Sequence, residues 1–239
     1  MPLKTFTNLP EARRKEIFAA CMEEFVQNGF QGASLSRIIR RLGLAKGSFY
    51  RYFESKRSLY ADLIEYASAS TSHIIKETFS KPAEDILDTW VEFYLACARQ
   101  DNSDPLLGYF GYRLSLDKNN PILGDVPLET LKKGTALLRD LFLRHQREGR
   151  IRADLDVERM IFVLLKVQSG FIEYLGLKHG IDFEDNIRRG KPLFPLSEEI
   201  LRGELEGFAR ILKSGFHPEA RPKGKDKSHA DEPAGPPEA

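Results

Sequence analysis

Apolar residues recur with the spacing of an amphipathic helix over the first part of the chain. In residues 11–30 they fall on one side of a helical projection, while polar residues that include Glu23 and Glu24 take the other side and are expected to be solvated. Pro10 suits a first helical turn and Gly29 suits a stop. The sequence therefore predicts a helix whose buried face consists of Ile17, Phe18, Cys21, Met22, Phe25 and Val26.

Two short helices and a long one are predicted next. Residues 35–42 fit a helix with Ser34 as its N-cap and Gly43 at its end, and residues 46–53 fit another. Residues 55–79 contain neither glycine nor proline, which predicts a helix of about six turns.

The remainder repeats the helical pattern, with breaks at clusters of Pro, Gly, Asn and Asp. The predicted helical segments are 83–100, 105–117, 127–148, 155–178 and 197–214. Because we find no run of alternating strands bounded by hairpin turns, the chain is predicted to be all-α with about nine helices.

These breaks divide the chain into three parts. Residues 1–54 form an N-terminal module, and residues 55–216 form a larger helical body in which 55–79 is the linking helix. The tail, 217–239, is rich in Pro, Gly, Ala and charge, so we expect it to be disordered.

The formal net charge of +1 hides an asymmetry along the 239 residues. Residues 1–57 hold 11 Lys and Arg against 5 Asp and Glu, whereas residues 58–239 hold 25 against 30. A basic module on a mildly acidic body favours a polyanion partner for the module, although a solvated charged surface has the same composition.

Composition also excludes several classes of protein. We find no run close to the ~18 to 20 apolar residues of a membrane span and no secretory signal, so we expect a cytoplasmic protein. Cys21 and Cys97 lack metal-ligand spacing and are expected to be reduced core thiols. The five histidines show no HxxxH or HExxH spacing, and GxSxG is absent, so neither an enzyme nor a metal or cofactor is predicted.

The two short helices match a helix-turn-helix. Gly43 suits the positive φ of the tight turn, and Leu35, Ile38, Leu42, Leu44 and Phe49 can hold both helices on the first one. The second short helix can then enter a DNA major groove and present Lys46, Gly47, Ser48, Tyr50, Arg51 and Tyr52. Ser34 and Lys56 add a hydroxyl and a positive charge for phosphates.

At this point the sequence resembles the tetracycline-repressor (TetR) type of bacterial regulator. The resemblance covers residues 13–64, "RRKEIFAACMEEFVQNGFQGASLSRIIRRLGLAKGSFYRYFESKRSLYADLI". It implies that Ser34, Ser36 and Arg37 face DNA from the first short helix, that the residues named above do so from the second, and that Lys56 holds a phosphate. Ala45 stands where the family usually has a capping Ser or Thr.

The resemblance also assigns roles to the body. It implies an effector pocket. The candidate lining residues, mostly aromatic and with one cation, are Trp90, Phe93, Tyr94, Cys97, Tyr109, Phe110, Tyr112 and Arg113. These walls favour an apolar or planar effector, and Arg113 suits an acidic group on it. An aromatic stripe at helical spacing is also what a plain core shows, so both interpretations stay open.

The last two predicted helices carry apolar stripes that resemble the family's dimer seam. The stripes are Met160, Leu164, Val167, Phe171 and Leu175 in one, and Leu201, Leu205, Phe208 and Leu212 in the other. Such stripes serve a subunit's own core equally well. A dimer fits DNA recognition, because two recognition helices ~34 to 36 Å apart read successive major grooves of a palindrome.

The sequence therefore predicts a homodimeric, ligand-responsive repressor of a palindromic operator, in which the helix 55–79 links effector to DNA. Two alternatives remain: a DNA-binding structural or cell-division factor without an effector, and a helical small-ligand carrier or enzyme with a vestigial DNA module.

Overall fold

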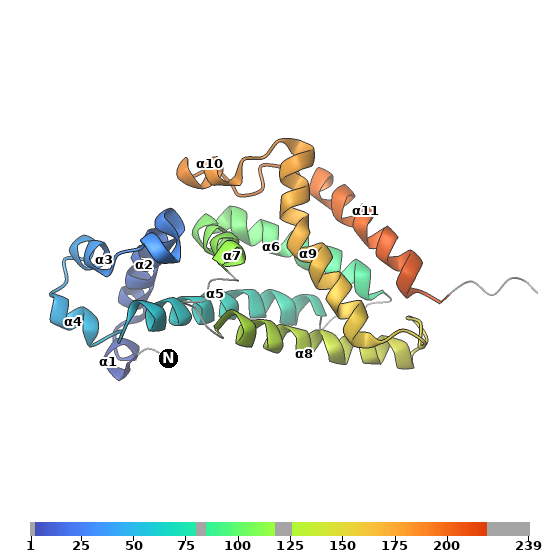
Figure 1. Cartoon of the computed structure of the whole chain (residues 1–239), viewed down its shortest axis with the longest axis horizontal. Helices are drawn as coiled ribbons and strands as arrows, with labels where there is room; N and C mark the ends of the chain where they lie inside the picture. The colour runs from blue at the N-terminus through green and yellow to red at the C-terminus, as the bar shows by residue number, and fades with distance from the viewer. Residues whose placement is uncertain (1–2, 80–84, 118–125, 219–239) are drawn as a thin grey trace, which may run out of the picture.

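A computed structural model of the chain describes residues 3–79, 85–117 and 126–218, without the side chains of 117, 126–134 and 137. The described ranges contain eleven helices and no strand, which confirms the all-α prediction (Figure 1). The helices are α1 (Lys4–Thr7), α2 (Glu11–Gly32), α3 (Leu35–Arg41), α4 (Lys46–Tyr50), α5 (Lys56–Phe79), α6 (Ile86–Ser103), α7 (Pro105–Asp117), α8 (Val126–Arg147), α9 (Val157–His179), α10 (Phe183–Arg188) and α11 (Glu198–Phe216). The tail expected to be disordered lies, from residue 219 on, outside the described residues.

Two glycines shape the N-terminal module as the sequence predicted. Gly29 has φ 62° and ψ 174°, which interrupts α2 at the expected stop, and the chain resumes a helical path to Gly32. Gly43 has φ 61°, and it turns the chain between α3 and α4. Both conformations lie in the region that side chains with a Cβ disfavour.

Two helices were not predicted. The four-residue α1 and the six-residue α10 are too short to show helical periodicity, and each is fixed by packing. Phe6 of α1 is buried among aromatic rings, and Phe183 and Ile187 of α10 are buried against the body. These two elements connect parts of the molecule that are distant in sequence.

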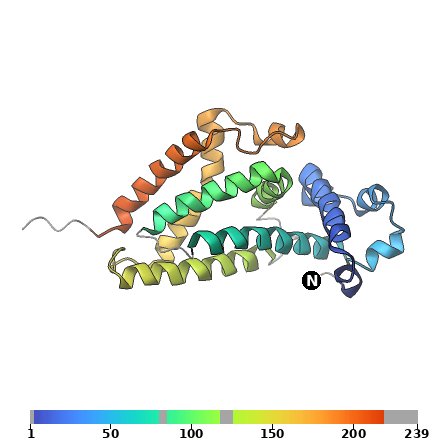
Figure 2. The same ribbon diagram turned by 180° about the vertical axis from the view of Figure 1, so that it is seen from behind.

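The body is a helical bundle in which α5 runs from the module along its length (Figure 1). α6 packs on α5, α7 and α11, and α8 packs on α9. α7 lies along α2, and α10 also contacts α2, so the body meets the module at two places besides α5 (Figures 1 and 2).

Aromatic side chains hold the module together. Phe49 and Phe53 are buried at the centre, 5.3 Å apart between ring centroids. Phe53 lies 4.9 Å from Phe6 and 6.1 Å from Phe18, so α1, α2 and the end of α4 share one core. Burial of a phenylalanine contributes about 1.5–3 kcal/mol, which gives the short helices their stability.

Helix α9 requires a correction. We expected no membrane-length apolar segment, yet among the described residues this helix is long and apolar enough, with a mean hydropathy of 1.5 over 18 residues. Only 28% of that segment is buried within the subunit, so α9 carries an apolar surface that the subunit itself does not cover.

Candidate nucleic-acid interface

Helix α4 presents most of the predicted DNA-contacting side chains to solvent. Lys46, Tyr50 and Arg51 are exposed, Ser48 is half-buried, and none of these four side chains has a hydrogen-bond or ion-pair partner among the described residues. Gly47 is exposed, and a Cβ there would meet nothing within 4 Å. The helix therefore offers unpaired donors beside backbone that a ligand can approach closely.

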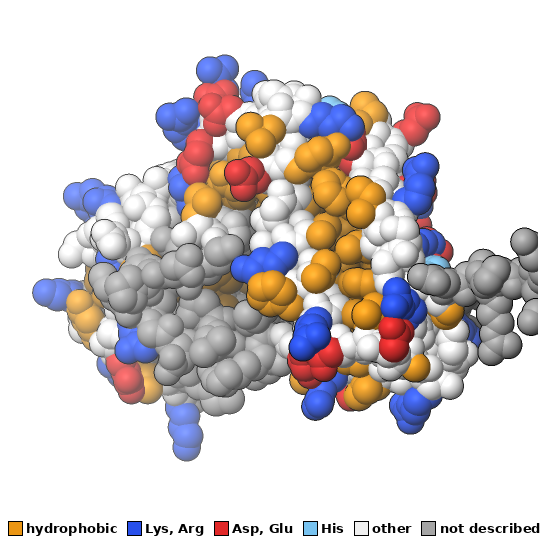
Figure 3. Space-filling view, turned by 45° about the vertical axis from the view of Figure 1, so that its right-hand side comes forward, with side chains coloured by type: hydrophobic (Ala, Val, Ile, Leu, Met, Phe, Trp, Pro, Cys, Tyr) orange, Lys and Arg blue, Asp and Glu red, His pale blue; other side chains and the backbone are white. Residues whose placement is uncertain are grey.

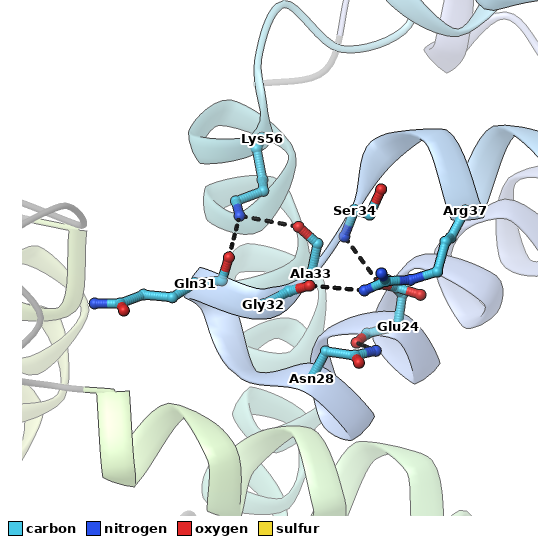
Figure 4. Close-up of polar contacts among 8 residues, drawn as sticks. All are labelled: Glu24, Asn28, Gln31, Gly32, Ala33, Ser34, Arg37 and Lys56. Carbon is cyan, nitrogen blue, oxygen red and sulfur yellow. Dashed lines mark hydrogen bonds and ion pairs between the residues drawn. The ribbon is translucent and has the colours of Figure 1, made fainter.

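The first turn of α3 is organised by Glu24 of α2 (Figure 4). One carboxylate oxygen, Oε1, accepts the Ser34 backbone N–H at 2.8 Å and bonds from Arg37 Nε and Nη2 at 2.9 and 2.5 Å. Arg37 Nη2 also donates to the Gly32 carbonyl at 2.7 Å. The Glu24 side chain is only 11% exposed, so the expectation that it is solvated was wrong.

The two serines, Ser34 and Ser36, differ from Arg37 in their bonding. Ser34 occupies the N-cap position, as predicted, but its hydroxyl makes no cap bond. Ser36 is exposed. The guanidinium of Arg37, by contrast, is bonded within the module, and this contact raises the pKa of Arg37. Neither serine hydroxyl has a hydrogen-bond partner among the described residues, whereas Arg37 joins α3 to α2.

Lys56 is also bonded within the module (Figure 4). Its ammonium donates to the Gln31 and Ala33 carbonyls, each at 3.0 Å, and lies 4.9 Å from the centroid of the Phe30 ring. These carbonyls belong to the end of α2, where the helix leaves acceptors without intrahelical donors. The Lys56 side chain thus links α5 to the end of α2. Its contact with a DNA phosphate stays a prediction.

Tyr52 lies beyond the end of α4 and packs on α1. Its ring is half-buried and 5.9 Å from Phe6, and its carbonyl accepts the Leu3 N–H at 3.2 Å. The hydroxyl of Thr5 donates to the Arg51 carbonyl. The sequence did not predict that α1 supports the end of α4, because the four-residue α1 is too short to show a helical pattern of its own.

The predicted effector residues fall into two groups. Trp90, Tyr94 and Cys97 follow one another at helical spacing on α6, and the Trp90 ring is 5.0 Å from Tyr94. The Trp90 indole N–H is buried and has no hydrogen-bond partner in the part of the chain that the structure describes. Burial raises the pKa of the Cys97 thiol to about 12, so the prediction of a reduced, unreactive thiol is consistent with its surroundings.

One residue missed by the sequence lies on the same face of α6. Asp101, one turn after Cys97, is half-buried and has no bonded partner among the described residues. Burial, with a smaller effect of the Asp104 carboxylate, raises its pKa to about 6. Spacing alone offered no signal for it, since a lone aspartate on a helix is usually solvated.

The second group belongs to other contacts. Phe93 packs on Phe79, and Phe110 is fully buried 5.4 Å from Tyr60. The remaining three, Tyr109, Tyr112 and Arg113, face α10 or the segment after it. The guanidinium of Arg113 is already paired with Glu184, which removes the support for an acidic group on the effector.

The predicted dimer residues of α9 and α11 face the subunit's own core. Seven of the nine are buried in the subunit's own core, and Val167 and Phe208 pack against it. The exposed apolar residues of α9 and α11 lie on a different face, which points away from the subunit core. Figure 3 shows a band of apolar side chains on this outer face. They are Phe162, Val163, Leu177, Ile200 and Ile211.

No group of side chains among the described residues is arranged to hold a metal ion. A shallow depression of about 550 Å³ lies at the turn between α8 and α9, where Ile151, Asp154 and Pro218 line it. It contains none of the predicted effector residues.

Comparison with known proteins identifies the module. Residues 17–63 match the family described as bacterial regulatory proteins of the tetR family. An HTH-type transcriptional repressor, AcnR of Corynebacterium diphtheriae, is 26% identical over 84% of this chain and 97% of its own length. An uncharacterised HTH-type regulator of Bacillus subtilis, YdgC, is 29% identical over 68% of this chain and 78% of its own.

A solved structure shares the whole architecture. The TetR family transcriptional regulator from Chloroflexus aurantiacus superposes with a TM-score of 0.65 at 26% identity, over 90% of this chain and 98% of that one. The likeness thus extends from the helix-turn-helix through the helical body.

The substitution Lys56→Met tests the structural role of this lysine. Loss of two hydrogen bonds and the contact with Phe30 should lower the free energy of unfolding by about 1–2 kcal/mol, as measured by urea denaturation. Lys76→Met, at an exposed lysine on the same helix, should change it by less than about 0.5 kcal/mol. Equal effects of the two substitutions would contradict the assignment.

Proposed function

Since this chain belongs to the tetR family of bacterial regulatory proteins, we propose that it represses transcription as a homodimer on a palindromic operator and releases DNA when an effector binds. It is a DNA-binding transcriptional regulator and not an enzyme, and its relative from C. diphtheriae is named a repressor. The proposal places it in the cytoplasm, with residues 1–54 as the DNA-binding domain and 55–216 as the effector and dimer domain.

The observation that carries the proposal is the distribution of unpaired polar groups. Lys46, Ser48 and Tyr50 of α4 and Arg51 at its C-cap have no hydrogen-bond or ion-pair partner within the described ranges, and they lie next to the open backbone at Gly47. Lysine and arginine neutralise phosphates or donate to guanine, and the hydroxyls reach phosphates or base edges. Donors left unpaired on a recognition helix are what a major groove requires.

At the edges of this surface the side chains have different roles. The free hydroxyls of Ser34 and Ser36 suit phosphate contacts at the start of α3. Tyr52 contributes through packing on α1 as well as through its hydroxyl. Arg37 and Lys56 act mainly by holding α3 and α5 against α2, so that the DNA-facing surface is rigid.

For the dimer, we propose the exposed apolar face of α9 and α11. Phe162 is 60% exposed and Ile211 is 69% exposed, and the face also includes Gly203 and Gly207, around which a Cβ would have open space. Small residues let helices of two subunits approach closely, and apolar residues gain from burial. This face explains why the membrane-length helix α9 is so little buried within one subunit.

For the effector, we propose a planar apolar molecule held against α6. Its aromatic partners would be Trp90 and Tyr94, and the buried indole N–H of Trp90 is free to donate to it. The unpaired carboxyl of Asp101 would accept from an amine or another donor. Effector binding is common in the family.

DNA recognition predicts distinct effects for two residues of α4. With a duplex selected by the wild-type protein from a random pool, Lys46→Ala should weaken binding about tenfold and reduce the salt slope by about one, because a phosphate contact is lost. Tyr50→Phe should weaken binding a few-fold and leave the slope unchanged. Lys76→Ala is the control; unchanged binding in both α4 variants would reject the proposed surface.

The proposed dimer face predicts the oligomeric state. Phe162→Asp and Ile211→Asp each place a charge in the interface, so light scattering should report one chain's mass where the wild type gives two. Leu116→Asp introduces the same charge at a 55% exposed leucine of α7 and should leave the dimer intact. A wild-type monomer at micromolar concentration would exclude this face.

The carboxyl of Asp101 predicts a pH-dependent stability. Its pKa is raised to about 6 from 3.8 in the folded protein, so the folded state binds the proton more tightly and stability falls as pH rises through this window. Asp101→Asn should therefore be more stable than wild type at pH 7.5, by about 2 kcal/mol in urea denaturation, and the difference should close near pH 4.

The same variant tests the effector class. Planar aromatic amines at pH 7.5 should raise the melting temperature of wild type more than that of Asp101→Asn, whereas matched neutral aromatics should act equally on both. If the amines act equally on both proteins, Asp101 is not part of an effector site.

A further inference from the structure

The guanidinium of Arg113 joins three helices at the junction between the module and the body. Its Nε donates to the Val26 carbonyl of α2 at 2.6 Å, and its Nη1 and Nη2 donate to the two carboxylate oxygens of Glu184, each at 2.7 Å. Arg113 itself comes from α7 and Glu184 from α10. A bidentate arginine–carboxylate pair fixes both distance and orientation, which a single hydrogen bond does not.

The carbonyl that Arg113 contacts is available because of the break in α2. Val26 lies in the last turn before Gly29, whose φ of 62° interrupts the helix. Carbonyls in the last turn of a helix lack intrahelical donors and carry the negative end of the dipole, so a cation is favourable there. The side chain of Arg113 is 19% exposed, and its bonds are thus partly shielded from water.

Helix α10 connects this contact to the helices of the proposed dimer. It lies between α9 and α11 in the chain, and its Phe183 ring is 5.5 Å from Tyr112 of α7. A Cβ at Gly176 of α9 would lie 3.2 Å from the Phe183 ring, so α10 folds tightly back on α9. The hydroxyl of Tyr109 donates to the Lys191 carbonyl, which fixes the segment after α10 to α7 as well.

The junction lies on the opposite side of α2 from the DNA-facing helices. In Figures 1 and 2, α7 and α10 approach α2 from the body, and α3 and α4 lie beyond it. A small rotation of α2 at Arg113 therefore moves α4 in each subunit. In a dimer, the two rotations together change the distance between the recognition helices.

We propose that Arg113 and Glu184 are positioning residues that set the half-site spacing read by the dimer. The inference rests on the proposed function, since spacing has meaning only for a dimer on a two-part site. The pair touches no base. It holds α2 at one angle to α10, and thus selects operators whose half-sites match that angle.

Operator spacing tests the proposal directly. The full-length dimer would first select its site from a random duplex pool. The selected half-sites would then be built into duplexes whose spacers differ by single base pairs, and into a duplex with one half-site. The expected wild-type preference is at least about tenfold for one spacing, and Arg113→Ala and Glu184→Gln should each reduce it to about threefold or less, with single half-site affinity within about twofold of wild type.

A matched control lies directly after α10. Arg189→Ala removes an exposed ion pair with Asp185 and leaves the junction untouched, so it should keep the wild-type preference. Unchanged preference in both junction variants would overturn the proposal, as would an equal loss at every spacing and on the single half-site, which denotes damage to the fold. Failure of the wild type to select any duplex would instead reject the proposed function and this inference with it.

Glu184→Gln keeps the experiment decisive if Arg113→Ala fails to fold. It retains the shape of the side chain and the Arg113–Val26 bond. It removes the negative charge and replaces one of the two accepting oxygens with an NH2 donor, so the bidentate pair is lost. Thermal melting of each variant, recorded before the DNA measurements, identifies the folded proteins to which the spacing comparison applies.

Discussion

A five-residue helix cannot hold its own shape in water, and the whole module is organised around that constraint. Helix nucleation is unfavourable, and α4 has no side-chain cap, since Ala45 occupies its N-cap position. Its stability comes from the buried Phe49, which packs on Phe53, and Phe53 in turn packs on rings from α1 and α2. The apolar side of α4 is thus buried in the core, and the other side is left exposed to solvent.

The cations of the module are of two kinds, those bonded within the protein and those without a bonded partner among the described residues. Arg37 and Lys56 are bonded to a carboxylate and to carbonyls of α2, and these bonds fix the helices that carry the reading surface. Lys46 and Arg51 have no such partner in the described chain. A motif alone does not distinguish the two kinds, because the partner of Arg37 lies 13 residues away, on another helix.

Periodicity predicted the helical class, the break at Gly29 and the turn at Gly43, because each depends on local backbone preferences. It missed α1 and α10, whose stability is tertiary. It also selected the inward faces of α9 and α11 for the dimer, although both helices carry exposed apolar residues on another face as well. Periodicity alone does not tell the buried apolar face of such a helix from the exposed one, because the difference depends on where the other helices of the body pack.

Two connections of different stiffness join the body to the module, and the difference bears on how an effector acts. Helix α5 is continuous and carries a buried ring, Tyr60, into the module core. The α7–α10 junction is a set of directed bonds at one point of α2. An effector shifts DNA binding only by the difference in its affinity for two arrangements of the subunit. If Arg113 restricts the module to one angle, an effector against α6 must displace α5 or weaken the junction. Release of DNA then requires enough differential affinity to overcome both connections, which favours an effector that contacts charged as well as aromatic groups.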